Sequence, residues 1–422
     1  MTTRLILDQM VEPAAARVLV RRAAGGQVIE ARFDLSGLPR VDSLLTGRPV
    51  ASLPSLIEHL CGVCPAAHHL AGVAALESLW GIDAIPPAAQ HLRRLLHHGS
   101  VLEVHAARFG LNQPLVQPIK ALGKAAARAA GSPGHFPTTA VVGGARQQAD
   151  PTDIGQLERA LPDALSAARQ LAHQMLDASQ SGTDRPDTYK GANLALVDDA
   201  GTLDPLGPRL GILDPSRTQL ADAATPSTWD DTVAMALADD PAPRPYLRRL
   251  GPDLGGYRVG PAAALRVAAP PPGQAAALRA EWLAGPGGPL AARAIMALSS
   301  VEAIATELDL LDPSDSDLRA TTANTSAEGV GVGWVDGARG LLVHRYEAAP
   351  GGTVRAGIVL TPTAQNEPWL AQLLTEAIGQ NQGPEAVALA EQAIRDVDPC
   401  LPCSAAPPGQ MHLEILDQPA GS

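Results

Sequence analysis

The 422-residue chain carries a net charge of −12 and contains 45% hydrophobic residues, enough apolar material for one large or two modest domains. An acidic chain with no basic patch is not expected to bind nucleic acid. We find neither an unbroken apolar run of about eighteen residues nor a basic-then-apolar signal region after Met1, so we expect a cytoplasmic protein without a membrane span.

The N-terminal part of the chain predicts a hairpin followed by long helices. Residues 18–33 alternate in the manner of two strands around an Ala-Gly-Gly turn. Pro54 is a typical first helical residue, and the helix it begins is predicted to continue to about Trp80. Further amphipathic helices rich in Ala and Leu are predicted at 88–110 and 154–180.

In the rest of the chain, a loop-rich segment is followed by a second series of predicted helices and strands. Residues 181–272 are rich in Pro, Gly and Asp and predict a loop-rich insertion with short strands. Helices are predicted again at 274–283 and 289–310, then a hairpin over 329–361 that turns at Pro350-Gly351-Gly352, then helices at 367–379 and 384–396. The expected fold class is therefore α+β: a mainly helical bundle with small peripheral sheets.

The four cysteines of the chain form two Cys-x-x-Cys pairs close to its ends, Cys61 with Cys64 and Cys400 with Cys403. Two spaced pairs, with no cysteine used elsewhere, predict four thiolates at one soft metal centre. Because both pairs must then meet, the N-terminal part (1–180) and the C-terminal part (273–422) must pack together. We therefore expect a single domain over 1–422, with 181–272 as an insertion.

Three other uses of such cysteine pairs remain open on spacing alone. A thioredoxin-like redox site needs one such motif after a strand, whereas this chain has two in unrelated contexts. A structural zinc site usually closes a short loop, and these pairs lie more than three hundred residues apart. Two disulfides would need an oxidising compartment, for which the N-terminus gives no sign.

The residues around both pairs resemble the metal motifs of the large subunit of nickel–iron (NiFe) hydrogenases. Leu60–Gly72 is similar to the N-terminal motif of that family, and Asp398–Cys403 is similar to its C-terminal motif. The segments that extend this similarity to the large subunits of cytoplasmic, bidirectional NAD-linked hydrogenases are 91–109, 257–261, 337–340 and 363–366. The resemblance covers nearly the whole chain and implies the helical fold of that subunit.

The resemblance also implies a cofactor and a role for each cysteine. The cofactor is a Ni–Fe centre whose iron carries two cyanides and one carbon monoxide, the Fe(CN)2CO unit. By position, Cys64 and Cys403 would bridge nickel and iron, while Cys61 and Cys400 would bind nickel alone. Soft thiolates suit both metals.

Four further residues gain a role from the resemblance that they would not have alone. Arg339, in a Gly-rich run, would otherwise be a solvated or ion-paired turn residue; in the family its guanidine, or a terminal thiolate, takes the proton when dihydrogen is split. Asp398, otherwise a turn residue before a proline, partners that arginine. His68, otherwise a buried core histidine, orients the cysteines or a cyanide. Glu12 matches the glutamate that carries the proton away.

Several positions depart from the family pattern. His59 stands where the family has an arginine, and Asp42 replaces a glutamate that helps to hold a magnesium ion. Ala406 replaces the final histidine, which binds that ion and marks the usual proteolytic cut, so magnesium is doubtful. Residues 408–415 resemble the tail that processed relatives remove, which suggests a chain that is never cut. We find no counterpart of a second active-site aspartate; residues 112–114 occupy its place.

Two functions of different class fit this pattern. The first, which the intact cysteine set favours, is a divergent hydrogenase large subunit that catalyses reversible dihydrogen oxidation. Since no cysteine remains for an iron–sulfur cluster, it would need an iron–sulfur small subunit to carry electrons. The second is a non-catalytic scaffold, similar to the large subunit, on which maturation proteins assemble the Fe(CN)2CO unit.

Overall fold

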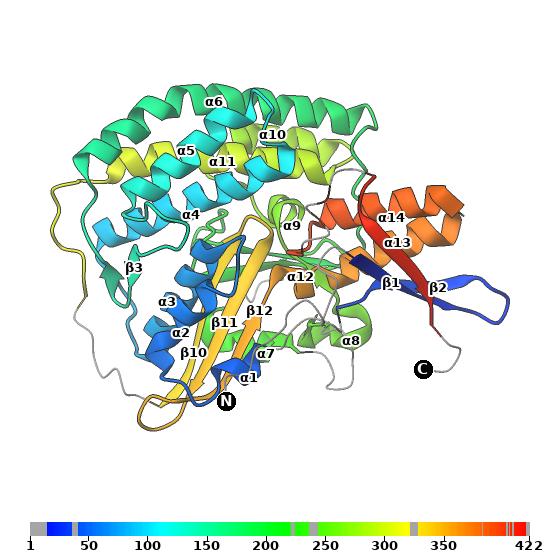
Figure 1. The fold of residues 1–422 in the computed structure, drawn as a ribbon, viewed down its shortest axis with the longest axis horizontal. Helices are drawn as coiled ribbons and strands as arrows, with labels where there is room; N and C mark the ends of the chain where they lie inside the picture. The colour runs from blue at the N-terminus through cyan, green and yellow to red at the C-terminus, as the bar shows by residue number, and fades with distance from the viewer. Residues whose placement is uncertain are drawn as a thin grey trace, which may run out of the picture.

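The computed structural model describes residues 15–35, 41–220, 224–235, 244–320, 328–381, 383–401, 404, 406 and 409–418. Long helices form one layer of the molecule, and small sheets with shorter helices lie beside it (Figure 1). The predicted α+β class, mainly helical with small sheets, is confirmed.

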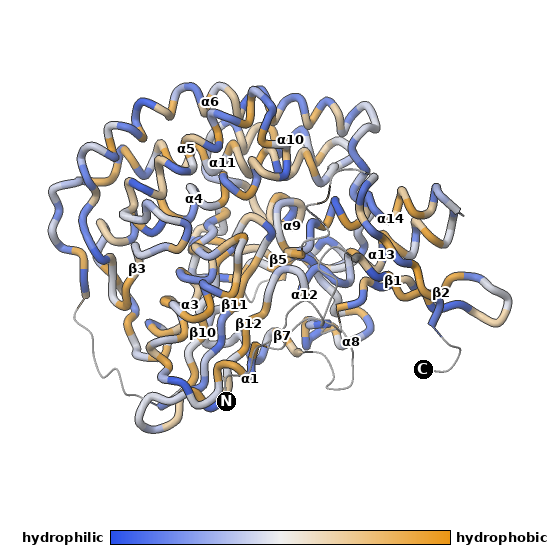
Figure 2. The backbone as a smooth tube through the Cα atoms, viewed as in Figure 1, coloured by the Kyte–Doolittle hydropathy of each residue, from blue (hydrophilic) through white to orange (hydrophobic). Residues whose placement is uncertain are grey.

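The long helices pack side by side along one edge of the molecule (Figure 1). Hydrophilic and hydrophobic residues alternate along the outermost of them, α6 (Figure 2). Its apolar side chains, such as Leu157 and Leu171, are buried against its neighbours. The helices of this layer are α4 (Pro87–Phe109), α5 (Val116–Ala129), α6 (Pro151–Gln180), α10 (Gln274–Ala284) and α11 (Pro289–Leu310).

Four of these helices confirm the sequence predictions to within three residues at each end, and α5 was not predicted. Among the described residues, one helix, α11, is long and apolar enough to cross a membrane. A search of the sequence for unbroken apolar runs does not reveal it, because charged and polar residues interrupt its apolar residues. However, 67% of its apolar window is buried inside the protein, as is usual for a core helix.

A three-stranded antiparallel sheet packs against α3 (Pro65–Leu79). Its strands are β10 (Gly329–Gly337), β11 (Gly340–Ala348) and β12 (Val354–Leu360), in the order β10-β11-β12. The predicted hairpin that turns at Pro350-Gly351-Gly352 is confirmed as β11–β12, but the prediction of two strands over 329–361 is wrong, because a second tight turn at Ala338-Arg339 separates β10 from β11. This turn places Arg339 at the end of the sheet.

The predicted helix over 54–80 is also wrong in one respect. It is divided into α2 (Leu53–Glu58) and α3, and residues 59–64 form a loop between them. Two helix breakers, Gly62 and Pro65, account for the interruption, because glycine costs a helix about 1 kcal/mol and proline lacks the N–H that an interior position needs. The first cysteine pair therefore lies on the loop.

The close contact between β10 and α3 depends on glycine. A Cβ atom on Gly333 would meet the backbone of Ala71 and Ala75 at less than 3.0 Å, a separation that real Cβ atoms essentially never show. Because backbone atoms cannot rotate away, Gly333→Ala should lower the free energy of unfolding by about 3 kcal/mol. Denaturant unfolding of the two proteins measures this, with Gly25→Ala as the control, since a Cβ there meets nothing within 4 Å. Equal losses in both variants would contradict the packing argument.

The ends of the chain meet in a second sheet. Strand β13 (His412–Asp417) runs parallel to β1 (Ala15–Arg22), which pairs antiparallel with β2 (Val28–Phe33). This sheet packs on α13 (Glu367–Gln380), followed by α14 (Gly383–Val397), which agrees with the predicted N-terminal hairpin and the last two helices. The segment that resembles a removable tail thus supplies a paired strand.

Short elements make up most of the remaining chain. A mixed sheet, in the order β6-β5-β9, crosses residues 181–272, and a short two-stranded ladder accompanies it. The strands are β3 (Ala140–Val141), β4 (Gly144–Ala145), β5 (Ala192–Val197), β6 (Arg209–Leu213), β7 (Val233–Ala234), β8 (Tyr246–Leu247) and β9 (Tyr257–Arg258). The helices are α1 (Asp42–Leu45), α7 (Trp229–Thr232), α8 (Gly251–Leu254), α9 (Pro261–Val267), α12 (Pro362–Gln365) and the 3₁₀ turns η2 (Val50–Ser52), η3 (Pro226–Thr228) and η4 (Arg248–Leu250).

Candidate metal centre

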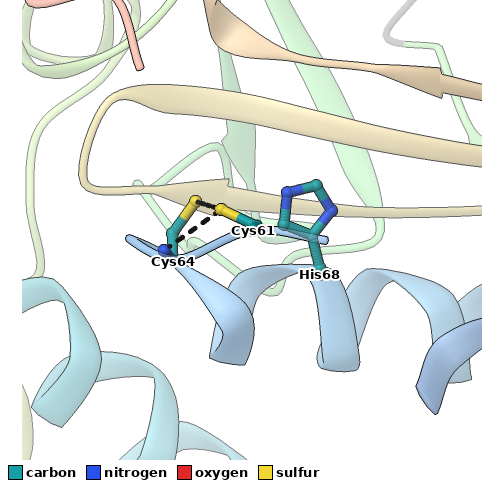
Figure 3. Close-up of side chains that lie close together, drawn as sticks. All are labelled: Cys61, Cys64 and His68. Carbon is teal, nitrogen blue, oxygen red and sulfur yellow. Dashed lines mark hydrogen bonds between the residues drawn. The ribbon is translucent and has the colours of Figure 1, made fainter. Parts of the chain in front are cut away.

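The first cysteine pair lies where the chain enters α3. Cys64 is the N-cap of the helix and Pro65 its first residue, a position that suits proline because no helical N–H is needed there. The Sγ atoms of Cys61 and Cys64 are 3.3 Å apart, and the Cys64 N–H donates to Cys61 Sγ over 3.3 Å. Figure 3 shows the two sulfur atoms facing each other. The helix start therefore holds two thiols in one place.

The second motif begins at the end of α14. Asp398 adopts a left-handed conformation (φ 54°), which aspartate tolerates better than most residues, and its N–H still donates to the Ile394 carbonyl over 2.9 Å. The chain reverses there and carries Cys400 away from the helix axis. The Cys400 N–H then donates to Thr363 Oγ1 over 2.8 Å, which fixes the loop against α12.

Thiols from both ends of the chain meet. Cys400 interacts through its thiol with Cys61 and Cys64, although more than three hundred residues separate the motifs. The Cys400 and Cys64 thiols lower the pKa of Cys61, whereas the pKa of Cys64 is raised, first by its contact with Cys400. Contact with Cys61 raises the pKa of Cys400 to about 11. Since only one thiolate is stabilised here, a cation that binds the trio must displace protons.

A buried ion-pair cluster lies beside these thiols. Arg339 Nε is 3.2 Å from Asp398 Oδ2, and Nε also donates to the Asp398 carbonyl over 3.1 Å. Arg293 of α11 holds the same carboxylate from the other side, with NH1 3.0 Å from Oδ2. Asp398 and Arg293 are only 3% and 4% exposed, so both charges depend on this pairing.

Arg339 is held without using all of its donors. Burial alone would lower its pKa, but Asp398 and then the sulfurs of Cys400 and Cys64 outweigh that effect and raise it. Its NH1 atom is buried, and no group in the described part of the chain accepts from it. A permanent cation with a free donor therefore stands next to the thiols.

The comparisons with known proteins agree with this geometry. A sequence profile for nickel-dependent hydrogenases matches residues 40–112, which include the first cysteine pair. A chain of the vhu F420-non-reducing hydrogenase of Methanocaldococcus jannaschii is 24% identical, over 86% of this chain and 95% of that protein. The NAD-reducing hydrogenase HoxS subunit beta of Cupriavidus necator is 23% identical, over 98% of this chain and 97% of that protein. The chain is therefore similar to nickel-dependent hydrogenases over nearly its whole length.

A solved structure supports the same assignment. An NAD+-reducing NiFe-hydrogenase in its H2-reduced state superposes with a TM-score of 0.80 and 25% identity, over 91% of this chain and 95% of the other. Nearly the whole fold of this chain is therefore shared with that protein.

His68 lies on the same side of α3 as the two cysteines (Figure 3). Its ligand atom and the two sulfurs lie within 4.8 Å of one another. His68 Nδ1 is 3.0 Å from His344 Nε2, and His344 Nδ1 is 2.6 Å from the Tyr346 hydroxyl. All three side chains are buried. The ring of His68 is thus fixed by a chain of side chains from β11.

The remaining predicted site residues are not all brought to this place. Cys403 and Glu12 lie outside the described residues. Asp42 is described and begins α1, which packs on β12. Among the described histidines, cysteines and carboxylates, the cluster whose ligand atoms all lie within 4.8 Å of one another contains Cys61, Cys64 and His68; it does not include Asp42, and the Cys400 thiol contacts the two cysteines from outside it.

Sequence reasoning missed three contributors to this site. Arg293 could have been noticed, because it is the one charged residue in the first half of the predicted helix over 289–310. His344 and Tyr346 alternate on one strand, a pattern that is ordinary for a half-buried β-strand. Their contact with His68 joins positions 276 residues apart, which no local signal reveals.

Proposed function

We propose that this chain is the catalytic large subunit of a hydrogenase and that it interconverts dihydrogen with protons and electrons. The observation that carries the proposal is the meeting of Cys61, Cys64 and Cys400 beside the Arg339–Asp398 pair. We propose Cys403 as the fourth ligand, since it belongs to the same motif as Cys400. We also propose that 1–422 acts as one domain, because both ends of the chain supply ligands.

The residues fit a Ni–Fe centre. Thiolates are soft donors that select such metals over magnesium or calcium, and the described thiols can release their protons when such a metal binds. The unpaired NH1 of Arg339 is a donor suited to an anionic ligand such as a cyanide on iron. When bound, the Ni–Fe centre with its Fe(CN)2CO unit would supply the place where dihydrogen is polarised and its electrons are collected. A magnesium ion is not part of the proposal.

The side chains of the site would accept and transfer the proton that dihydrogen releases. Asp398 and Arg293 hold the Arg339 guanidinium in one orientation, so that it meets dihydrogen without reorganisation. The thiolate of Cys61 accepts the proton from the split molecule, because the Arg339 guanidinium is already protonated, and we propose Glu12 as a later carrier. His68, fixed by His344, keeps the Cys61 thiol in place.

Electrons would leave through a partner protein. The four cysteines are committed to the metal site, so the chain has no ligands left for an iron–sulfur cluster. Large apolar side chains are exposed next to the first cysteine pair, with Leu60 51%, Val63 45% and Phe136 40% exposed. We propose that an iron–sulfur subunit docks there, in the cytoplasm, close enough to the thiols for electron transfer.

The wild-type protein, purified with its partner, tests this function. We expect nickel and iron in equal amounts, infrared bands of cyanide and carbonyl groups, and hydrogen–deuterium exchange between D2 and water. Iron without nickel, together with no exchange, would instead indicate the assembly scaffold. The relatives of this chain are named as hydrogenases or parts of them, and none of them supports that alternative.

A further inference from the structure

A cavity of about 250 Å³ runs along α4 on the side that faces α9 and α11. One end is lined by the exposed residues Pro271, Pro272 and Thr306. The other end is lined by the buried His105 and by Ala338. The cavity therefore leads from the surface to the residue that precedes Arg339.

Its inner end touches the proposed metal site. Ala338 packs with Val101 and Val104 of α4, which places the β10–β11 turn directly beside the start of the His105 turn of that helix. The charges of Arg293 and Arg339 both act on the His105 ring and, after burial itself, lower its pKa. His105 thus stands between the cavity and the ion-pair cluster that holds Arg339.

Buried histidines line this cavity. His97, His98 and His105 are 3%, 6% and 1% exposed, and the rings of His97 and His98 are 5.1 Å apart. His98 and His105 are seven residues apart, so they share a helix face about 10 Å apart along the axis. The Nδ1 atoms of both are buried and have no protein partner among the described residues. A bare buried imidazole nitrogen costs about 1–3 kcal/mol, so water in the cavity is the expected partner.

A partly buried carboxyl group completes the polar lining. Asp336 of β10 lines the cavity, and its Oδ2 accepts a long contact of 3.4 Å from the Leu196 N–H. Burial raises its pKa to about 7, so this group gains and loses a proton near neutral pH. The cavity volume is enough for about eight waters at roughly 30 Å³ each. Water can therefore connect His105, His98 and Asp336 with the surface.

We propose that this cavity is a water-filled proton route between the metal site and the surface beside α11, separate from Glu12; it rests on the hydrogenase function proposed above. A proton released at the metal site passes through water to one ring nitrogen of neutral His105, and the ring gives the proton on its other nitrogen to the next water. The charge of His105 is unchanged after each transfer. His98 and Asp336 repeat this exchange, and the proton leaves at the open end.

An apolar passage for gas is the competing use of the cavity. Val101, Leu203 and Met296 give it apolar walls as well. A dry passage would leave the two imidazole nitrogens without partners, which is why the observations favour water. A crystal structure separates the two: ordered waters at Nδ1 of His98 and of His105 are expected. A dry cavity that takes up pressurised xenon would overturn the proton route.

Turnover of the complete enzyme tests the route in a second way. In a Glu12→Gln background, which closes the other proposed carrier, His98→Phe and His105→Phe should keep nickel, iron and the infrared bands but lose on the order of a hundredfold in rate relative to Glu12→Gln alone, the scale of one positioned proton-transfer group. The solvent deuterium isotope effect on turnover should rise in both. His173→Phe, at an exposed position of α6, is the control and should change neither quantity.

Chemical rescue excludes a merely structural effect. In His98→Ala on the same Glu12→Gln background, added imidazole should restore turnover, whereas pyrrole, a ring of similar size without an accepting nitrogen, should not. Equal rescue by both rings, or turnover of the phenylalanine variants at the rate of Glu12→Gln alone, would overturn the route while the proposed function stands. A metal-loaded wild type that shows no turnover would overturn the proposed function and the route with it.

Discussion

Cys64→Ser should yield a protein without bound iron, whereas Cys61→Ser should keep iron and lose nickel. The proposed bridging role of Cys64 requires its sulfur to contact both metals, and its place at the N-cap of α3 beside Cys61 and Cys400 suits that role. A serine hydroxyl is a hard, protonated donor and replaces a soft thiolate poorly. We expect the affinity for iron to fall on the order of a hundredfold or more. Loss of a residue that merely hydrogen-bonds to a metal ligand already lowers metal affinity by up to about a hundredfold, and Cys64 is proposed as a ligand itself.

Metal analysis with infrared spectroscopy of the purified variants measures this result. The near-isosteric change should leave the metal-free proteins equally stable, so the thermal midpoints of apo wild type and apo Cys64→Ser serve as the control. Cys403→Ser should behave as Cys64→Ser does, and Cys400→Ser as Cys61→Ser does. Wild-type iron in both bridging variants would show that the assignment of bridging and terminal ligands is wrong.

The metal site could be predicted from the sequence because its chemistry is concentrated in few residues. Two Cys-x-x-Cys pairs, with no other cysteine, leave few uses besides a shared soft metal, so the meeting of Cys61 with Cys400 follows from ligand count alone. The paired role of Arg339 and Asp398 came only from family resemblance. The spacing of the two residues in the sequence gives no reason for this pairing, but the structure does. A left-handed turn at Asp398 and a tight turn at Arg339 bring the two side chains together.

What the sequence did not reveal depends on contacts between distant segments. Arg293 and His344 reach the site from α11 and β11, and nothing near either residue in the chain indicates the partner. The break in the helix at Gly62 was readable, but the apolar pattern on both sides of it favoured a continuous helix. The prediction gave more weight to the apolar helical pattern than to the low helix propensity of glycine. In the structure, the low propensity decides, and the helix is interrupted.

Arg339→Lys should leave the metal content unchanged and lower the rate of hydrogen–deuterium exchange on the order of a hundredfold, the scale of one positioned acid–base group. The guanidinium donates from Nε to Asp398 and still presents NH1 as a buried free donor. A lysine ammonium keeps the positive charge but offers a single point, so it cannot pair with Asp398 and present a donor in a second direction. The loss should therefore appear in the rate and not in the assembly of the site.

Arg345→Lys is the matched control, because Arg345 lies on the same strand, β11, and pairs at 2.9 Å with the exposed Asp230. Its exchange rate should stay close to that of the wild type. If Arg339→Lys also exchanged at the wild-type rate, the guanidinium would have no part in splitting dihydrogen, and Cys61 would remain as the base. If nickel and iron were lost together with the rate, Arg339 would be needed to assemble the site, since its charge is the one that offsets the thiolates of Cys64 and Cys400. Only intact metals with a slow rate support a direct role of Arg339 in proton transfer.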